Sequence, residues 1–237
     1  MSSLGSRRTD PQESHLTNHR TIVDLSHPIT DGMVTYPGLP EPAISDHMTR
    51  REAEGKYAPG VTFQIGRIEM VGNTGTYLDS PFHRYEEGSD LSDLDLDRLV
   101  DVEAIALDLS GRSERAVDIA QVESHDVTGR AVLLHTGWDL RWGTPAYGVD
   151  APYLTAAAAR WLVDRSPALV GIDSVNIDDP NDPERPAHST LLAAGIPIVE
   201  HLCHLDRLPS RGFRFTAVPA PVRGFSSFPI RAVAVIQ

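Results

Sequence analysis

The sequence contains a single cysteine, Cys203, among its 237 residues. One cysteine cannot form a disulfide within the chain, so the fold must be held together without that cross-link. Such sparing use of cysteine is typical of a reducing compartment, and we therefore expect a cytoplasmic location. No base partner for Cys203 is evident in the sequence, so we interpret it as a small buried hydrophobic residue and not as a nucleophile.

Positive charge is also scarce. The chain has 21 Lys and Arg against 33 Asp and Glu, which gives a formal net charge of −12. Nucleic-acid binding requires a basic surface that displaces counterions, and anionic membranes attract basic segments. The charge balance therefore predicts that neither a nucleic acid nor a membrane surface is a partner, and that a small molecule is the expected ligand.

Long apolar runs are missing too. No stretch of eighteen or more apolar residues occurs, so the sequence predicts no membrane-spanning helix. Residues 1–20 are polar and lack the apolar centre of a signal peptide, and we interpret them as a disordered N-terminal arm. The glycine patterns of phosphate-binding and dinucleotide-binding loops are absent as well.

What is present is an ordinary globular composition, with 41% hydrophobic and 23% charged residues. The length suffices for a sizeable core, and we predict a single domain over residues 21–237. Short runs of apolar and β-branched residues predict strands over 21–26, 61–71, 102–109, 131–135, 168–173, 196–200, 213–218 and 231–236. Helices are predicted only over 118–124, over 155–164 and after His188. Because strands outnumber helices, the predicted fold class is α/β or α+β, with layers around a mixed sheet.

The densest group of turn-forming and titratable residues lies between Gly72 and His83, directly after the strand predicted over 61–71. Pro81 forbids a regular strand or helix interior there, and Ser80 followed by proline is typical of a helix start. We therefore expect Asp79 and His83 to flank a corner between a strand and a turn. Such a corner can aim a carboxylate and an imidazole at one point.

A second stretch, residues 186–200, carries the next group of polar residues. His188 opens a short predicted helix, Gly195 ends it, and Glu200 closes the apolar run that follows. Each of these features is weak evidence for a site when taken alone, because a histidine at a helix start or a glutamate at a strand end is common on protein surfaces.

Together the two stretches resemble the cyclase family of metal-dependent hydrolases, which includes bacterial kynurenine formamidases and isatin hydrolases. That family carries His-x-Gly-Thr-His-x-Asp-x-Pro-x-His, followed much later by a His and a Glu around a Leu-Leu-x-x-Gly-Ile-Pro run. Here Asn73 stands at the first histidine of the motif and Tyr77 at the second. The resemblance extends from about Ile22 to Ile236, and it implies a swivelling β/β/α domain that assembles into dimers or tetramers.

The resemblance also implies roles for individual residues. In the family one or two divalent ions activate water for attack on an amide, lactam or ester carbonyl. Asp79 matches the carboxylate that bridges the ions, His188 matches an imidazole ligand, and Glu200 matches a second carboxylate ligand. His83 matches the histidine that donates and accepts a proton. The family has an aromatic-Pro-Gly loop over the substrate, which makes Tyr36 a candidate lid residue, with a packed surface turn as the alternative.

Both departures from the motif affect the same ion. An amide oxygen and a phenol are poorer zinc ligands than imidazole, and a tyrosine normally ionises only near pH 10. We therefore expect at most one divalent ion, zinc or manganese, held by Asp79, His188 and Glu200. Tyr77 and Asn73 would then orient the substrate or complete a weakened metal shell.

Three functions remain open at this point. The first is a hydrolase that cleaves a C–N or C–O bond of a small cyclic or aromatic substrate. The second is a metal-free acid–base enzyme, a cyclase, dehydratase or isomerase, that uses Tyr77, Asp79, His83 and Glu200. The third is a catalytically silent binding protein, in which Tyr36 and Phe82 simply hold a ligand. His201 follows Glu200, but extended geometry predicts that it faces the opposite side of the strand.

Overall fold

A computed structural model describes residues 20–237, and the arm predicted over residues 1–20 lies outside this range except for Arg20. The helices are α1 (Ile119–Val122), α2 (Ala156–Val163) and α3 (Pro186–Ala193). The strands are β1 (Thr21–Asp24), β2 (Ala43–Met48), β3 (Ile65–Glu69), β4 (Tyr77–Asp79), β5 (Val102–Asp108), β6 (Ala116–Val117), β7 (Ala131–His135), β8 (Tyr153–Leu154), β9 (Leu169–Ile172), β10 (Ile198–Glu200), β11 (Phe213–Thr216), β12 (Ser227–Pro229) and β13 (Val233–Ile236).

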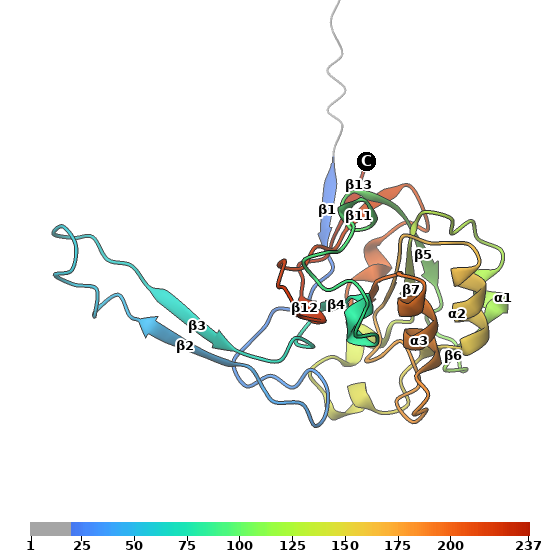
Figure 1. Cartoon of the computed structure of the whole chain (residues 1–237), viewed down its shortest axis with the longest axis horizontal. Coiled ribbons are helices and arrows are strands. Elements are labelled where there is room, and N and C mark those ends of the chain that lie inside the picture. The colour runs from blue at the N-terminus through green and yellow to red at the C-terminus, as the bar shows by residue number, and fades with distance from the viewer. Residues whose placement is uncertain (1–19) are drawn as a thin grey trace, which may run out of the picture.

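A nine-stranded mixed sheet forms the body of the molecule (Figure 1), with the strand order β1-β13-β11-β5-β7-β9-β10-β4-β12. Strands β5, β7, β9 and β10 run parallel to one another, whereas β4 lies antiparallel between β10 and β12. The mixed α/β fold class predicted from the sequence is therefore confirmed.

Helices α2 and α3 pack beside each other on one side of the sheet (Figure 1). Thr155 caps α2, because its hydroxyl accepts a hydrogen bond from the backbone N–H of Ala158 at 3.1 Å. The alanine-rich sequence favours the helix, and its Ala158, Ala159 and Leu162 are buried. Gly195 follows α3 with a φ of 70°, a left-handed conformation that glycine adopts at little cost.

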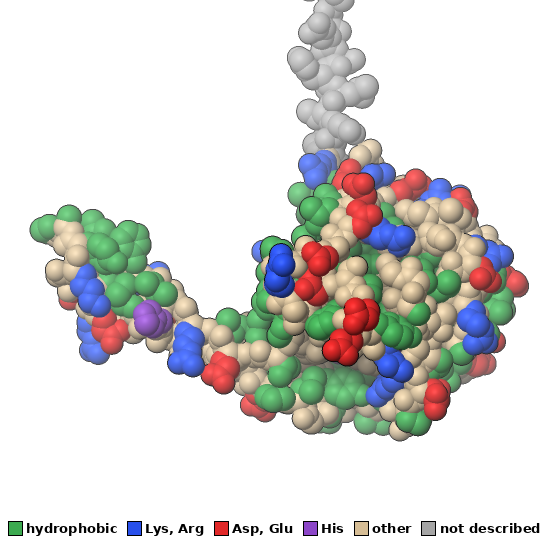
Figure 2. Space-filling view, in the orientation of Figure 1, with side chains coloured by type: hydrophobic (Ala, Val, Ile, Leu, Met, Phe, Trp, Pro, Cys, Tyr) green, Lys and Arg blue, Asp and Glu red, His purple; other side chains and the backbone are tan. Residues whose placement is uncertain are grey.

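An arm projects from the body and consists of the antiparallel pair β2 and β3 with the connection between them (Figure 1). Hydrophobic side chains gather toward the free end of this arm (Figure 2). Phe63 is 53% exposed and Ile65 is 46% exposed, and Tyr57 and Ile68 are exposed as well. The arm therefore presents a group of exposed apolar side chains outside both cores of the body.

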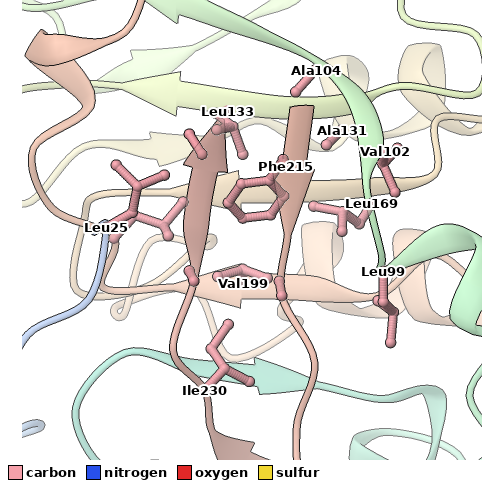
Figure 3. Packing of buried hydrophobic residues seen from close by; sticks show 14 of the residues in the cluster. Leu25, Leu99, Val102, Ala104, Ala131, Leu133, Leu169, Val199, Phe215 and Ile230 are labelled. Carbon is pink, nitrogen blue, oxygen red and sulfur yellow. The ribbon is translucent and has the colours of Figure 1, made fainter. Parts of the chain in front are cut away.

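The two faces of the sheet carry separate cores because side chains alternate along each strand. In β7, Leu133 belongs to the core drawn in Figure 3 with Phe215 and Val199. Its neighbours Val132 and Leu134 belong to the other core, which contains Leu162 of α2 and Leu191 of α3. Burial on both faces explains why the central strands are continuous apolar runs in the sequence.

The prediction of strands was least accurate in the β2–β3 arm. The strand predicted over 61–71 covers only Ile65–Glu69, and its partner β2 was not predicted. Both strands lie largely exposed, so no alternation between a buried and a polar face marks them. The short strands β6, β8 and β12 were missed too, because two or three residues cannot display a period. Within residues 20–237, the structure has no helix that is both long and apolar enough to cross a membrane.

Candidate metal centre and active site

Strand β4 brings the motif residues against β10 and β12. Its Tyr77 lies opposite Glu200 of β10, and its Asp79 lies opposite Ser227 of β12. The Tyr77 hydroxyl donates a hydrogen bond to the Glu200 carboxylate, and the Ser227 hydroxyl donates one to Asp79. Asp79 and Glu200 are fully buried, so each carboxylate depends on partners supplied by the protein.

His188 enters the same site from the first turn of α3. The Asp178 carboxylate accepts hydrogen bonds from the backbone N–H groups of Ala187 and His188, at 2.6 and 3.0 Å. It also contacts Nδ1 of His188 at 2.7 Å. A carboxylate on Nδ1 fixes the proton there and presents the lone pair of Nε2, as is usual for histidine ligands of metals. Nothing in the local sequence marks Asp178, because its hydrogen-bond partners Ala187 and His188 lie nine and ten positions later.

Three ligand atoms then converge without a hydrogen bond between them. Nε2 of His188 lies 3.5 Å from Oδ2 of Asp79 and 3.6 Å from Oε1 of Glu200. Oδ2 of Asp79 is buried and has no hydrogen-bond partner among residues 20–237. Two ligands of a tetrahedral ion, each bound at about 2.0–2.2 Å, are separated by roughly 3.3–3.6 Å. The residues predicted as ligands therefore fit a divalent ion.

A second set of possible metal ligands includes His83 and overlaps with the first. Ligand atoms of Asp79, His83 and His188 all lie within 4.8 Å of one another. Nδ1 of His83 lies 3.0 Å from the Ser227 hydroxyl and 3.7 Å from Oδ1 of Asp79. Glu200 is more fully engaged, because Oε1 accepts the backbone N–H of Ile177 at 2.6 Å and Oε2 accepts the Tyr77 hydroxyl. Asp79 and His188 are common to both sets.

Electrostatics in the site favour a cation. Burial alone would lower the pKa of His188, but the hydrogen bond to Asp178 and the nearby carboxylates of Asp79 and Glu200 raise that pKa to about 10. Burial, together with repulsion from Asp79, raises the pKa of Glu200 to about 7 despite the nearby His188. The negative field that holds a proton on the imidazole would equally attract a metal ion.

Tyr77 behaves as a hydrogen-bond donor and not as a phenolate. Burial, followed by the charges of Glu200 and Asp79, raises the pKa of Tyr77 well above its usual value near 10. Asn73 points its amide nitrogen at Oδ1 of Asp79, 3.4 Å away. The two residues that replace the motif histidines thus both contact a carboxylate of the site, Tyr77 as a protonated phenol.

A cavity of about 400 Å³ opens over these groups. Its lining consists of Tyr36, Leu39, Asn73, Tyr77, His83, Arg84, Asn176, Pro183, Glu184, Arg185, His188 and Glu200. Tyr36 is among the lining residues, and its role as a lid stays a prediction. Phe82 is half-buried on the turn after β4 and does not line the cavity, so the predicted substrate contact by Phe82 has no support in the structure. The other lining residues were not predicted: Leu39, Arg84, Asn176, Pro183, Glu184 and Arg185.

Other titratable groups lie outside the cavity. His201 is fully buried and does not line the cavity, and its Nδ1 lies 2.8 Å from the Tyr147 hydroxyl. The extended geometry assumed for it is wrong, because β10 ends at Glu200 and His201 has a left-handed φ of 57°, which brings its ring to 5.2 Å from that of Tyr77. Burial, with repulsion from His27, lowers the pKa of His201 to about 3. Cys203 is buried, and burial raises its pKa to about 12, which agrees with its interpretation as a hydrophobic residue.

Known proteins resemble this chain over most of its length. The sequence model of one family, described as "Putative cyclase", matches residues 23–179. The kynurenine formamidase of Geobacillus thermodenitrificans (strain NG80-2) is 30% identical over 212 residues, which cover 89% of this chain and 95% of that protein. The kynurenine formamidase of Bacillus cytotoxicus (strain DSM 22905 / CIP 110041 / 391-98 / NVH 391-98) is 27% identical over the same shares.

Solved structures share the fold. Isatin hydrolase A from Ralstonia solanacearum superposes with a TM-score of 0.77 at 22% identity, over 92% of each chain. A structure described as a potential metal-dependent hydrolase with cyclase activity superposes with a TM-score of 0.74 at 25% identity, over 92% of this chain and 98% of that one.

Proposed function

The chain belongs to the cyclase family, and from that premise we propose that it is a hydrolase of a small aromatic or cyclic substrate. The bond cleaved is the C–N bond of an amide or lactam, or the C–O bond of a lactone or ester. One observation carries the proposal: ligand atoms of Asp79, His188 and Glu200 converge in a buried site beneath a cavity of about 400 Å³. The names of the relatives, kynurenine formamidase and isatin hydrolase, support a hydrolase.

A single divalent ion, zinc or manganese, is the cofactor that this donor set fits. Asp79, His188 and Glu200 would hold it. When bound, such an ion polarises a carbonyl group and lowers the pKa of water toward neutrality. Only one ion is expected, because Asn73 and a protonated Tyr77 stand where the family carries histidines.

His83 is the proton carrier in this proposal. Its side chain is 33% exposed, so it can meet both a substrate in the cavity and water. Ser227 holds Nδ1 at 3.0 Å, which orients the ring. His83 would accept a proton as water attacks and return it to the leaving nitrogen or oxygen. Tyr77 keeps Glu200 in place, and Asn73 and Tyr36 contact the substrate from the cavity wall.

A metal-free acid–base enzyme remains the second candidate. The observation in its favour is the pair formed by Tyr77 and Glu200, because a carboxyl group with a pKa of about 7 can both give and take a proton near neutral pH. A cyclase, dehydratase or isomerase would use this pair with His83. Metal content separates the two candidates.

The test is elemental analysis of the protein purified without added metal or chelator, compared with Asp79→Ala and His188→Ala. We expect about one equivalent of zinc or manganese in the wild type, lost from both variants and kept in His125→Ala, which removes an exposed histidine. Two equivalents would make Asn73 and Tyr77 true ligands. No metal, with none bound on titration, would contradict the hydrolase and favour the acid–base enzyme.

We also propose that the protein is a cytoplasmic homo-oligomer, a dimer or a tetramer, with the β2–β3 arm in the interface. The exposed apolar side chains of the arm support the assembly, and the single cysteine supports the location.

A further inference from the structure

Two arginines line the catalytic cavity without a carboxylate partner. Neither Arg84 nor Arg185 forms an ion pair within residues 20–237, whereas Arg115 and Arg130, for example, each pair with acidic residues. We propose that Arg84 and Arg185 bind a carboxylate group of the substrate, so that the enzyme acts on anionic aromatic or cyclic compounds. This inference rests on the proposed function of the same cavity.

Arg185 directly precedes α3, and two long hydrogen bonds orient its side chain. Its Nη1 donates to Oδ1 of Asn176 at 3.3 Å and to the backbone carbonyl of Asp179 at 3.5 Å. Nε and Nη2 have no partner among the described residues, so one edge of the guanidinium remains free. The backbone of Arg185 has a φ of 47°, a left-handed conformation that is costly for a residue with a side chain. Strain of this kind is often kept at functional sites.

Arg84 comes to the same part of the rim from the turn after β4. Its Nε donates to the Ser189 hydroxyl at 3.3 Å, and its guanidinium lies over the Tyr85 ring. Both Nη atoms of Arg84 are without a partner among the described residues. Ser189 also donates its backbone N–H to the carbonyl of Arg185 at 2.9 Å, so the two arginines are tied to one turn of α3. The planar guanidinium matches the geometry of a carboxylate.

The charge of the rim selects the kind of anion. Arg84 and Arg185 contribute two positive charges, and the exposed Glu184 contributes one negative charge, which leaves one positive charge to balance a monoanion. A carboxylate meets this balance better than a phosphate dianion. The chain as a whole carries a formal charge of −12 and repels anions, so a substrate carboxylate needs a local partner of this kind.

The experiment measures equilibrium binding of benzoate, benzamide and phenyl phosphate to metal-free protein by calorimetry. Removing the metal prevents it from holding the carboxylate itself. We expect benzoate to bind most tightly. Arg84→Gln and Arg185→Gln should each weaken benzoate binding about tenfold and leave benzamide binding within about twofold. Glu184→Gln should strengthen benzoate binding, and Arg160→Gln, an exposed arginine on α2 that does not line the cavity, should change nothing.

Three results would overturn the inference: benzoate and benzamide binding alike or not at all, phenyl phosphate binding more tightly than benzoate, or the arginine variants weakening both benzene ligands equally. Hydrolysis of formanilide and 2-formamidobenzoate by the zinc-loaded enzyme is a separate readout. If neither compound is cleaved, the proposed hydrolase is in question, while the binding experiment still decides the role of the arginines.

Discussion

Tyr77 shows how one residue changes the chemistry of the motif. A histidine at this position would offer a lone pair to a metal, whereas the buried phenol keeps its proton and donates a hydrogen bond to Glu200. The phenol therefore satisfies a buried carboxylate that would otherwise need another donor or a second ion. Asn73 does the same for Asp79 through its amide group.

Restoring the two histidines should restore the second metal. We expect the double variant Asn73→His/Tyr77→His to bind about two equivalents of zinc where the wild type binds about one, because two imidazoles would then stand beside Asp79. Elemental analysis after zinc loading and gel filtration measures this. Asn73→Ala/Tyr77→Phe is the matched control, since it removes the same groups without adding ligands, and it should stay at one equivalent. A double histidine variant with one equivalent would contradict the prediction.

At the scale of elements, the start of α3 is both a helix terminus and a part of the site. Asp178 binds two backbone N–H groups of the first turn and Nδ1 of His188, so the same carboxylate stabilises the helix and orients the imidazole. The strands β10 and β4 supply the remaining ligands on a rigid frame.

Loss of the Asp178 charge should weaken metal binding without removing a ligand. For Asp178→Asn we expect the affinity for zinc to fall about 10-fold to 100-fold, because Nδ1 loses its carboxylate partner. Competition with a chromogenic chelator measures the affinity. Asp182→Asn is the control, since Asp182 caps a neighbouring loop residue, Glu184, and does not contact His188. Equal affinities for the wild type and Asp178→Asn would show that Asp178 serves the helix alone.

At the scale of the whole molecule, stability should depend on pH through His201. Its pKa is about 3 in the folded protein and about 6.5 in the unfolded chain, so between these values only the unfolded chain takes up the proton. The contribution of His201 to the free energy of unfolding therefore falls as the pH falls through this window, by about 2 kcal/mol between pH 6.5 and 5. His27, whose pKa is lowered to about 4 by burial, contributes with the same sign. Glu200, with its raised pKa, contributes with the opposite sign.

Comparison of the wild type with His201→Asn isolates the contribution of this histidine to stability. His201→Asn tolerates the left-handed backbone at this position, where φ is 57°, and removes the titrating group. Urea unfolding at several pH values should show that the difference in stability between wild type and His201→Asn shrinks by about 2 kcal/mol from pH 6.5 to pH 5. A difference independent of pH would contradict the buried neutral state of His201.

The β2–β3 arm should determine the oligomeric state. We expect the wild type to be a dimer or a tetramer by light scattering, and Phe63→Ser/Ile65→Ser to shift it toward the monomer, because two exposed apolar side chains of the arm are lost. Leu140→Ser is the control, since it removes an exposed leucine from the body. A monomeric wild type at micromolar concentrations would refute the assembly.

The sequence by itself determined most of the sheet and the helix ends. The predicted strand over 131–135 is β7 to the residue, and the caps at Thr155 and Gly195 lie where they were expected. These features are local: hydrophobic period, capping and turn preference depend on residues a few positions apart. The motif likewise identified Asp79, His83, His188 and Glu200 as neighbours, through a resemblance to known proteins.

Only the tertiary structure decided how those residues are partnered. The bond from Tyr77 to Glu200 spans 123 positions of sequence, and the bond from Ser227 to Asp79 spans 148. Asp178, the two cavity arginines and the pairing of β2 with β3 were equally invisible, because the order of strands in a sheet and the aim of side chains into a shared cavity follow from packing of the whole chain. Local pattern specifies the elements, and long-range packing specifies the site.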